Sequence, residues 1–130
     1  MKKLIALLVV VFALFVLVGC TPKDQVAAKE KMEGKDYKVV VDGTIQPAAL
    51  KLLGVEGVES VLTATKTVEN KDGEKESIAL EAIFFDTADH AKAALKTIQE
   101  EAKKNGEKSE VKQAGKWLYY GSDHAVKDFK

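Results

Sequence analysis

The sequence contains no arginine, and every basic residue among its 130 is a lysine. The planar guanidinium fork, which binds phosphate and carboxylate groups through two parallel hydrogen bonds, is therefore absent. Basic and acidic residues balance at 20 each, so no excess of positive charge attracts nucleic acid, and we expect no nucleic-acid partner. A single cysteine, Cys20, excludes any disulfide within the chain, so the core alone has to stabilise the fold.

The motifs of common enzymes are also missing. The chain has no phosphate-binding glycine loop of the Walker or dinucleotide type, no HExxH or CxxC motif, and no GxSxG nucleophile motif. We therefore expect no cofactor, no resident metal and no catalytic residue. The sequence favours a protein that is not an enzyme.

The first twenty residues are dominated by an apolar run. Two lysines precede an unbroken apolar stretch, residues 4–18, which Gly19 and Cys20 follow. A charged start, an apolar centre and a small residue at the end are typical of an export signal. An uncleaved membrane helix fits less well, because it needs about 20 apolar residues. An ordinary secretory signal also fits less well, because Leu17 stands where that signal has a small residue.

The last four residues of this stretch, Leu17, Val18, Gly19 and Cys20, resemble the lipobox of bacterial lipoprotein precursors. The resemblance implies that residues 1–19 are a signal peptide, which the lipoprotein signal peptidase removes. It also implies that Cys20 carries a thioether-linked diacylglycerol, and it allows a further acyl chain, such as palmitate, on the new N-terminus. Two or more acyl chains are enough for stable membrane anchoring.

This resemblance predicts a location and a first partner. We expect the protein to be exported and lipid-anchored to the membrane, at the outer face of the cytoplasmic membrane. The lack of arginine is typical of AT-rich genomes and indicates a low-GC bacterium. The membrane is thus the first expected partner, and a protein or peptide of the cell envelope is the second.

Residues 20–36 are rich in lysine and glutamate and carry few apolar side chains. A solvated, lipidated tether is the simplest interpretation, and as a flexible chain it would hold the domain roughly 20 to 25 Å from the bilayer. The alternative is a helix from Pro22 to Glu33 that ends at Gly34 and docks on the domain. The small folded domain itself is expected at residues 37–130.

Residues 37–130 alternate between short strand and helix patterns. Strands are predicted at residues 37–43, 58–69, 77–85 and 110–121, the last broken into a hairpin at 114–116, and helices at 48–53, 88–104 and 122–129. This order predicts an α+β domain of the split βαβ, or ferredoxin-like, type, in which the two main helices cover one face of an antiparallel sheet. The core is expected to include Ile83, Phe84, Leu95 and Ile98.

The only two histidines lie in acidic neighbourhoods. Asp86 and His90 are four positions apart, so they share a helix face, and their side chains are of the kind that ligates metals. An aspartate at a helix N-terminus also has a purely structural explanation, because it caps the helix. A site that joins this pair to His124 is disfavoured, because the expected topology places the two histidines two or three strands apart.

Aromatic residues concentrate in the segment Trp117 to Tyr120. Alternation along a strand places Trp117 and Tyr119 on one side and Leu118 and Tyr120 on the other. We expect Leu118 and Tyr120 to face the core. Trp117 and Tyr119 would then form an outward aromatic platform on an edge hairpin, which is a candidate site for capture of a peptide partner by strand addition.

The function most consistent with these patterns is that of a membrane-anchored surface lipoprotein whose domain is a non-catalytic binding or interaction module of the cell envelope. The alternative is a small envelope enzyme or metal-binding protein that uses Asp86, His90 or His124.

Overall fold

The computed structural model describes residues 21–130, so Cys20 and the predicted signal peptide lie outside the described residues. Its elements in chain order are α2 (Gln25–Glu33), β1 (Lys38–Asp42), α3 (Ile45–Leu52), β2 (Val58–Glu69), β3 (Lys75–Phe85), α4 (Ala88–Lys104), β4 (Lys112–Ala114), β5 (Trp117–Gly121) and α5 (Asp123–Phe129). Within residues 21–130, no helix combines the length and the apolar character needed to cross a membrane.

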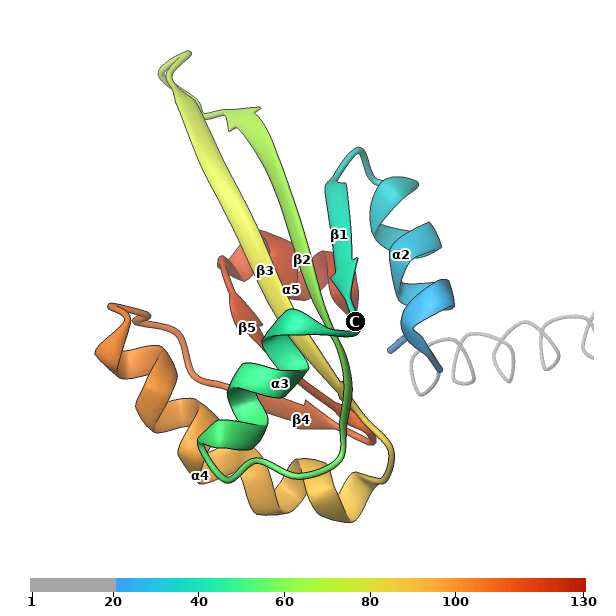
Figure 1. The fold of residues 1–130 in the computed structure, drawn as a ribbon. Coiled ribbons are helices and arrows are strands. Elements are labelled where there is room, and N and C mark those ends of the chain that lie inside the picture. The colour runs from blue at the N-terminus through green and yellow to red at the C-terminus, as the bar shows by residue number, and fades with distance from the viewer. Residues whose placement is uncertain (1–20) are drawn as a thin grey trace, which may run out of the picture.

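The strands form one sheet in the order β1-β2-β3-β5-β4 (Figure 1), and every neighbouring pair is antiparallel. The predicted α+β class is confirmed. The split βαβ order is wrong, because that arrangement requires β1 and β2 to run parallel with another strand between them. Here β1 pairs directly with β2, with Val40 opposite Thr63.

The error in topology originates in α3. A crossover helix has to bury one face on the sheet, yet no residue of α3 is buried. The chain instead turns back after α3 and pairs β2 with β1. The connection that does cross over runs from β3 through α4 to β4, and β5 returns between them. The predicted hairpin at residues 114–116 is confirmed and joins β4 to β5.

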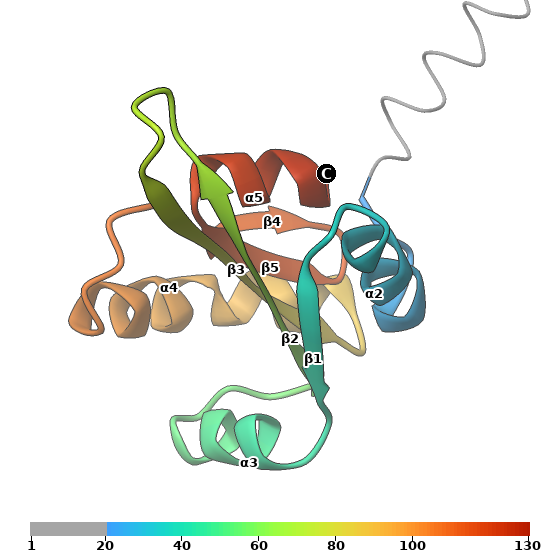
Figure 2. The ribbon, with the colours of Figure 1, turned by 90° about the horizontal axis from the view of Figure 1, so that it is seen from above.

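Helices cover both faces of the sheet (Figure 2). α3 and α4 share one face, as expected, and Leu50 is the α3 residue that packs against the core there. The opposite face, which the two main predicted helices leave uncovered, is covered by α2 and α5. The central strand β3 accounts for this, because its two sides are both apolar and both need cover, with Phe84 on one side and Phe85 on the other.

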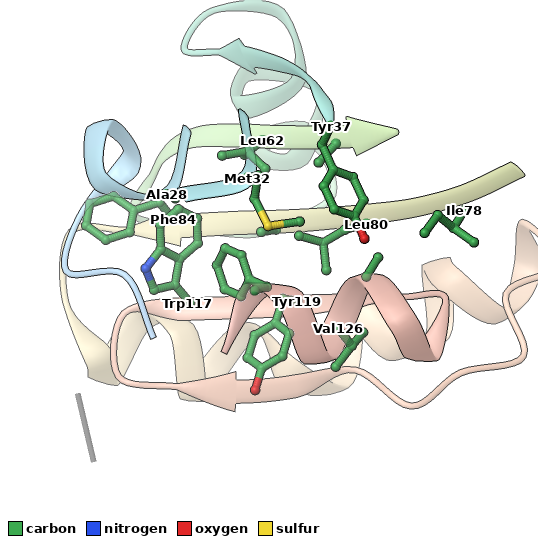
Figure 3. Packing of buried hydrophobic residues seen from close by; sticks show 14 residues of the cluster. Ala28, Met32, Tyr37, Leu62, Ile78, Leu80, Phe84, Trp117, Tyr119 and Val126 are labelled. Atoms are coloured by element: carbon green, nitrogen blue, oxygen red, sulfur yellow. The ribbon is translucent and has the colours of Figure 1, made fainter. Parts of the chain in front are cut away.

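The core under α2 and α5 is the larger and more aromatic of the two (Figure 3). The ring of Trp117 lies 4.7 Å from that of Phe84 and 5.1 Å from that of Phe129, between centroids. These are favourable tilted and edge-to-face arrangements. The cluster joins α2, the sheet and α5 through Ala28, Met32, Tyr37, Leu62, Ala64, Ile78, Leu80, Ala82, Phe84, Trp117, Tyr119, Ala125, Val126 and Phe129.

The core under α4 is mainly aliphatic, with Phe85 as its buried aromatic residue. Ala91, Ala94, Ile98 and Ala102 of α4 are buried, three or four positions apart, as an amphipathic helix requires. Burial of Ile83, Phe84 and Ile98 is therefore confirmed. Leu95 is only partly buried, because it lies at the side of this stripe and packs against the rim of the cluster.

The segment expected to be a solvated tether is folded. α2 begins after Asp24, whose side chain accepts a 2.8 Å hydrogen bond from the backbone nitrogen of Ala27. Ala28 and Met32, one helical turn apart, are fully buried against the sheet. The spacer interpretation is therefore wrong, and the alternative of a docked helix that ends at Gly34 is confirmed. The folded domain includes α2.

Candidate functional site

Trp117 and Tyr119 do not form an outward platform. Trp117 is 2% exposed and Tyr119 is 4% exposed, because both point into the core that α2 and α5 cover. Leu118 and Tyr120 point to the other face, as the alternation predicted, and Leu118 is buried there. β5 also pairs with strands on both sides, so it offers no free backbone edge for strand addition.

Asp86 and His90 form a close pair at the start of α4. The Nδ1 atom of His90 lies 2.6 Å from the Oδ1 atom of Asp86, and both side chains are a little under half exposed. The hydrogen bond to Asp86, followed by the charge of Asp86, raises the pKa of His90. The same hydrogen bond lowers the pKa of Asp86. Gly57 adjoins the pair with a φ of +81°, and a Cβ there would overlap both side chains.

His124 is not brought to this pair. It lies on α5, on the opposite face of the sheet from α4, and its Nε2 atom is 3.4 Å from the Oδ2 atom of Asp128. Within residues 21–130, no group of three or more histidine, cysteine or acidic side chains is arranged to hold a metal ion. The three residues of the alternative function therefore belong to two separate places.

Asp128 is the centre of a polar cluster that the sequence did not reveal. The hydroxyl of Tyr37 donates a 2.7 Å hydrogen bond to it, and the ammonium groups of Lys35 and Lys66 lie 3.7 and 4.0 Å from its oxygens. Burial raises the pKa of Asp128, but the Tyr37 hydrogen bond and the nearby cations lower it by more. The cluster connects the loop before β1 to α5, so its contacts are those of a structural junction.

A groove lies between α3 and α4. One part has a volume of about 170 Å³ and is floored by Glu81 of β3 and Tyr120 of β5. A second part, about 240 Å³, continues past the same two residues toward Glu107. The apolar walls of the first part are Ala49, Leu50, Leu53, Ile83, Ile98 and Ala102. Apolar walls with a few polar groups at the floor are typical of binding sites.

The groove is acidic. Glu81, Glu101 and Glu107 line its two parts and no lysine is among the lining residues, although the ammonium group of Lys104 lies 3.4 Å from the carboxylate of Glu101. The hydroxyl of Tyr120 donates a hydrogen bond to Glu81. Burial, followed by this hydrogen bond, raises the pKa of Tyr120, so the phenol remains protonated and neutral. The groove therefore presents negative charge next to apolar surface, which complements a side chain with an aliphatic stem and a cationic end.

α3 adds an exposed apolar surface beside this groove. Leu52 is 89% exposed, Ile45 75% and Leu53 49%, and Leu53 also lines the groove. Single exposed leucines are common on proteins, but here two large aliphatic side chains of α3, Ile45 and Leu52, and that of its C-cap residue, Leu53, are exposed within nine residues. The sequence predicted a helix at residues 48–53, but that prediction did not show which of its side chains stay exposed.

Comparison with known proteins gave no further guide, since no protein family, curated protein or solved structure matches this chain.

Proposed function

We propose that this protein is a lipid-anchored lipoprotein of the bacterial envelope, and that its domain is a non-catalytic module that binds a polypeptide partner in the α3–α4 groove. The anchor is supported by the lipobox at Leu17, Val18, Gly19 and Cys20. The groove supports the binding role, because it combines apolar walls with the carboxylates of Glu81 and Glu101.

The exposed aliphatic surface of α3 is the observation that carries the proposal. Ile45 and Leu52 are mostly exposed and Leu53 is half exposed, so a partner that covers them gains the free energy of removing their surface from water. The acidic groove beside them favours a partner segment with lysine or arginine side chains and disfavours an acidic one.

Site-specific crosslinking in the native cell tests this function. A photoreactive residue in place of Leu53 should crosslink to a distinct protein, which mass spectrometry then identifies, whereas the same residue in place of Asp72, in the β2–β3 turn, should not. Combining the Leu53 probe with Glu81→Gln and Glu101→Gln, which remove charge and keep shape, should reduce the product. The groove is not the binding site if the probes at Leu53 and Asp72 give equal crosslinked products. The same conclusion follows if Glu81→Gln and Glu101→Gln leave the Leu53 product unchanged.

The metal content of the purified soluble domain distinguishes the alternative function. A stoichiometric metal that is lost on His90→Ala or His124→Ala would favour a metal-binding protein, because these are the only histidines in the chain. The binding-module proposal expects no such metal.

A further inference from the structure

We infer that the first residues after Cys20 are latched to the core, so that the domain rests directly on the bilayer with one defined end toward it. This inference depends on the lipid anchor proposed above. In this arrangement the domain is not loosely tethered, because the fold fixes its distance from the bilayer and its orientation.

The latch is a buried hydrogen bond. The indole Nε1 of Trp117 donates to the backbone carbonyl of Pro22 over 2.7 Å, and both residues are buried. The indole packs against the ring of Phe84 (Figure 3) and also against that of Phe129, so the donor cannot follow a moving chain. A buried donor that lost its acceptor would be left unsatisfied, and the cost of its desolvation keeps the carbonyl in place.

The chain beyond the latch is also fixed. Asp24 caps α2, and the buried Ala28 and Met32 hold α2 on the sheet. The segment therefore has two attachments in its first twelve residues, one at Pro22 and one along α2.

Little free chain remains between the latch and the anchor. Only Thr21 separates Cys20 from Pro22. An extended chain advances at most about 3.6 Å per residue, so the lipidated residue lies within about 7 Å of Pro22. A flexible spacer of the whole segment would instead allow roughly 20 to 25 Å.

The latch also selects the end of the domain that faces the membrane. Trp117 opens β5 directly after the β4–β5 turn, and it lies opposite Phe84 near the end of β3. The other end of the sheet is the β2–β3 turn at Asn70 to Glu74, which projects beyond the remaining elements (Figure 1). At about 3.3 Å per residue, β3 places this turn about 30 Å from the anchored end.

The partner class follows from this placement. A domain held within a few ångströms of the bilayer meets molecules at the membrane surface, such as the extracellular segment of a membrane protein. The α3–α4 groove lies on the sheet face opposite to α2, so the anchor segment does not cover it.

Energy transfer to the bilayer tests the latch in the lipidated full-length protein, reconstituted in phosphatidylglycerol vesicles that carry an acceptor lipid. Lys116→Cys and Asp72→Cys offer single labelling sites, because the anchor consumes Cys20. Transfer should be several-fold stronger from position 116 than from position 72. Equal transfer from the two positions would overturn the inference, since it indicates a freely tumbling domain.

Two further variants test whether the Trp117–Pro22 hydrogen bond and the short linker to Cys20 fix the orientation of the domain. Trp117→Phe keeps an aromatic ring and removes the donor, so the difference between the two signals should become smaller even though α2 stays docked, whereas Tyr119→Phe in the same cluster should leave the signals unchanged. A flexible Gly-Ser insertion between Cys20 and Thr21 leaves the core intact and should weaken transfer from position 116. An insertion without effect would show that the chain was already loose.

Failure of the anchor itself gives a different result. If Cys20 is not lipidated, the wild-type protein does not stay with the vesicles at all, and no position gives transfer. A loose tether, by contrast, leaves the protein bound and only makes the two positions equal.

Discussion

Tyr37 and Asp128 are joined by a 2.7 Å hydrogen bond although 91 positions separate them in the sequence. The bond connects the loop between α2 and β1 to α5. It therefore links the two helices that cover the aromatic core.

Tyr37→Phe should lower the free energy of unfolding by about 1 kcal/mol, the net contribution of a typical hydrogen bond, and by more where the acceptor is charged. Tyr119→Phe is the matched control, because Tyr119 belongs to the same cluster and makes no such bond to Asp128. Urea unfolding of both variants measures the difference. An equal loss in both would show that the hydroxyl of Tyr37 contributes nothing specific.

The pair formed by Asp86 and His90 should be visible in a pH titration. Its hydrogen bond raises the pKa of His90 above the ordinary value of about 6.5, so the bonded, charged pair is fully present below that pH and is lost as pH rises through the higher value. In NMR titrations, Asp86→Asn should move the pKa of His90 back down, and Asp72→Asn should not. A His90 pKa that is the same in wild type and Asp86→Asn contradicts the pairing.

Ser60→Ala should leave stability unchanged or increase it. The Ser60 hydroxyl is buried beside the irregularity between Val58 and Ser60, and it is the only buried side-chain oxygen or nitrogen of the described residues without a hydrogen-bond partner. Its removal therefore relieves an unsatisfied group. Leu62→Ala on the same strand should cost about 2 to 5 kcal/mol, because Leu62 is fully buried. Thermal unfolding of the two variants provides the comparison.

Ile98 and Leu95 should contribute differently to the free energy of unfolding. Ile98→Ala should cost about 2 to 5 kcal/mol, because its side chain is buried under α4. Leu95→Ala should cost clearly less, because Leu95 is only partly buried. Chemical denaturation decides the order, and a larger loss at Leu95 would mean that α4 is rotated about its axis.

Cys20→Ser should abolish lipidation. Cys20 is the only thiol in the chain, so the variant has no sulfur with which to form the thioether to diacylglycerol. The precursor should then stay unprocessed and fail to take up a palmitate analogue in cells. Labelling of the variant equal to that of wild type would rule out the lipoprotein proposal.

Local chemistry let the sequence predict most element boundaries. The pattern of residues 58–69 predicted β2 with its observed bounds, and α4 ends at its predicted last residue, Lys104, before Asn105 and Gly106. These features depend on neighbours in the chain, such as caps and turn glycines, and so they can be derived from short windows. Ser122 precedes α5, but its hydroxyl accepts a hydrogen bond from the backbone nitrogen of Ala79 and does not cap the helix.

The topology and the covered faces could not be derived in that way. The alternation of side chains along β5 correctly placed Trp117 and Leu118 on opposite faces of the sheet. It does not show whether helices cover one face or both. The face that carries Trp117 is covered in part by α2. The sequence of α2 is highly charged, and the only strong indication that it docks is the pair Ala28 and Met32, one helical turn apart. The groove was missed for a related reason, because Glu81 and Tyr120 meet only once β3 and β5 pair.

Trp117 is the only tryptophan in the chain, and it lies where the N-terminal segment, the sheet and α5 meet. The protein thus carries its own optical reporter. Its emission should be blue-shifted and resistant to acrylamide in the folded state. Because the same indole contacts Pro22, a red shift that precedes global unfolding would report detachment of the N-terminal segment in an unlabelled sample.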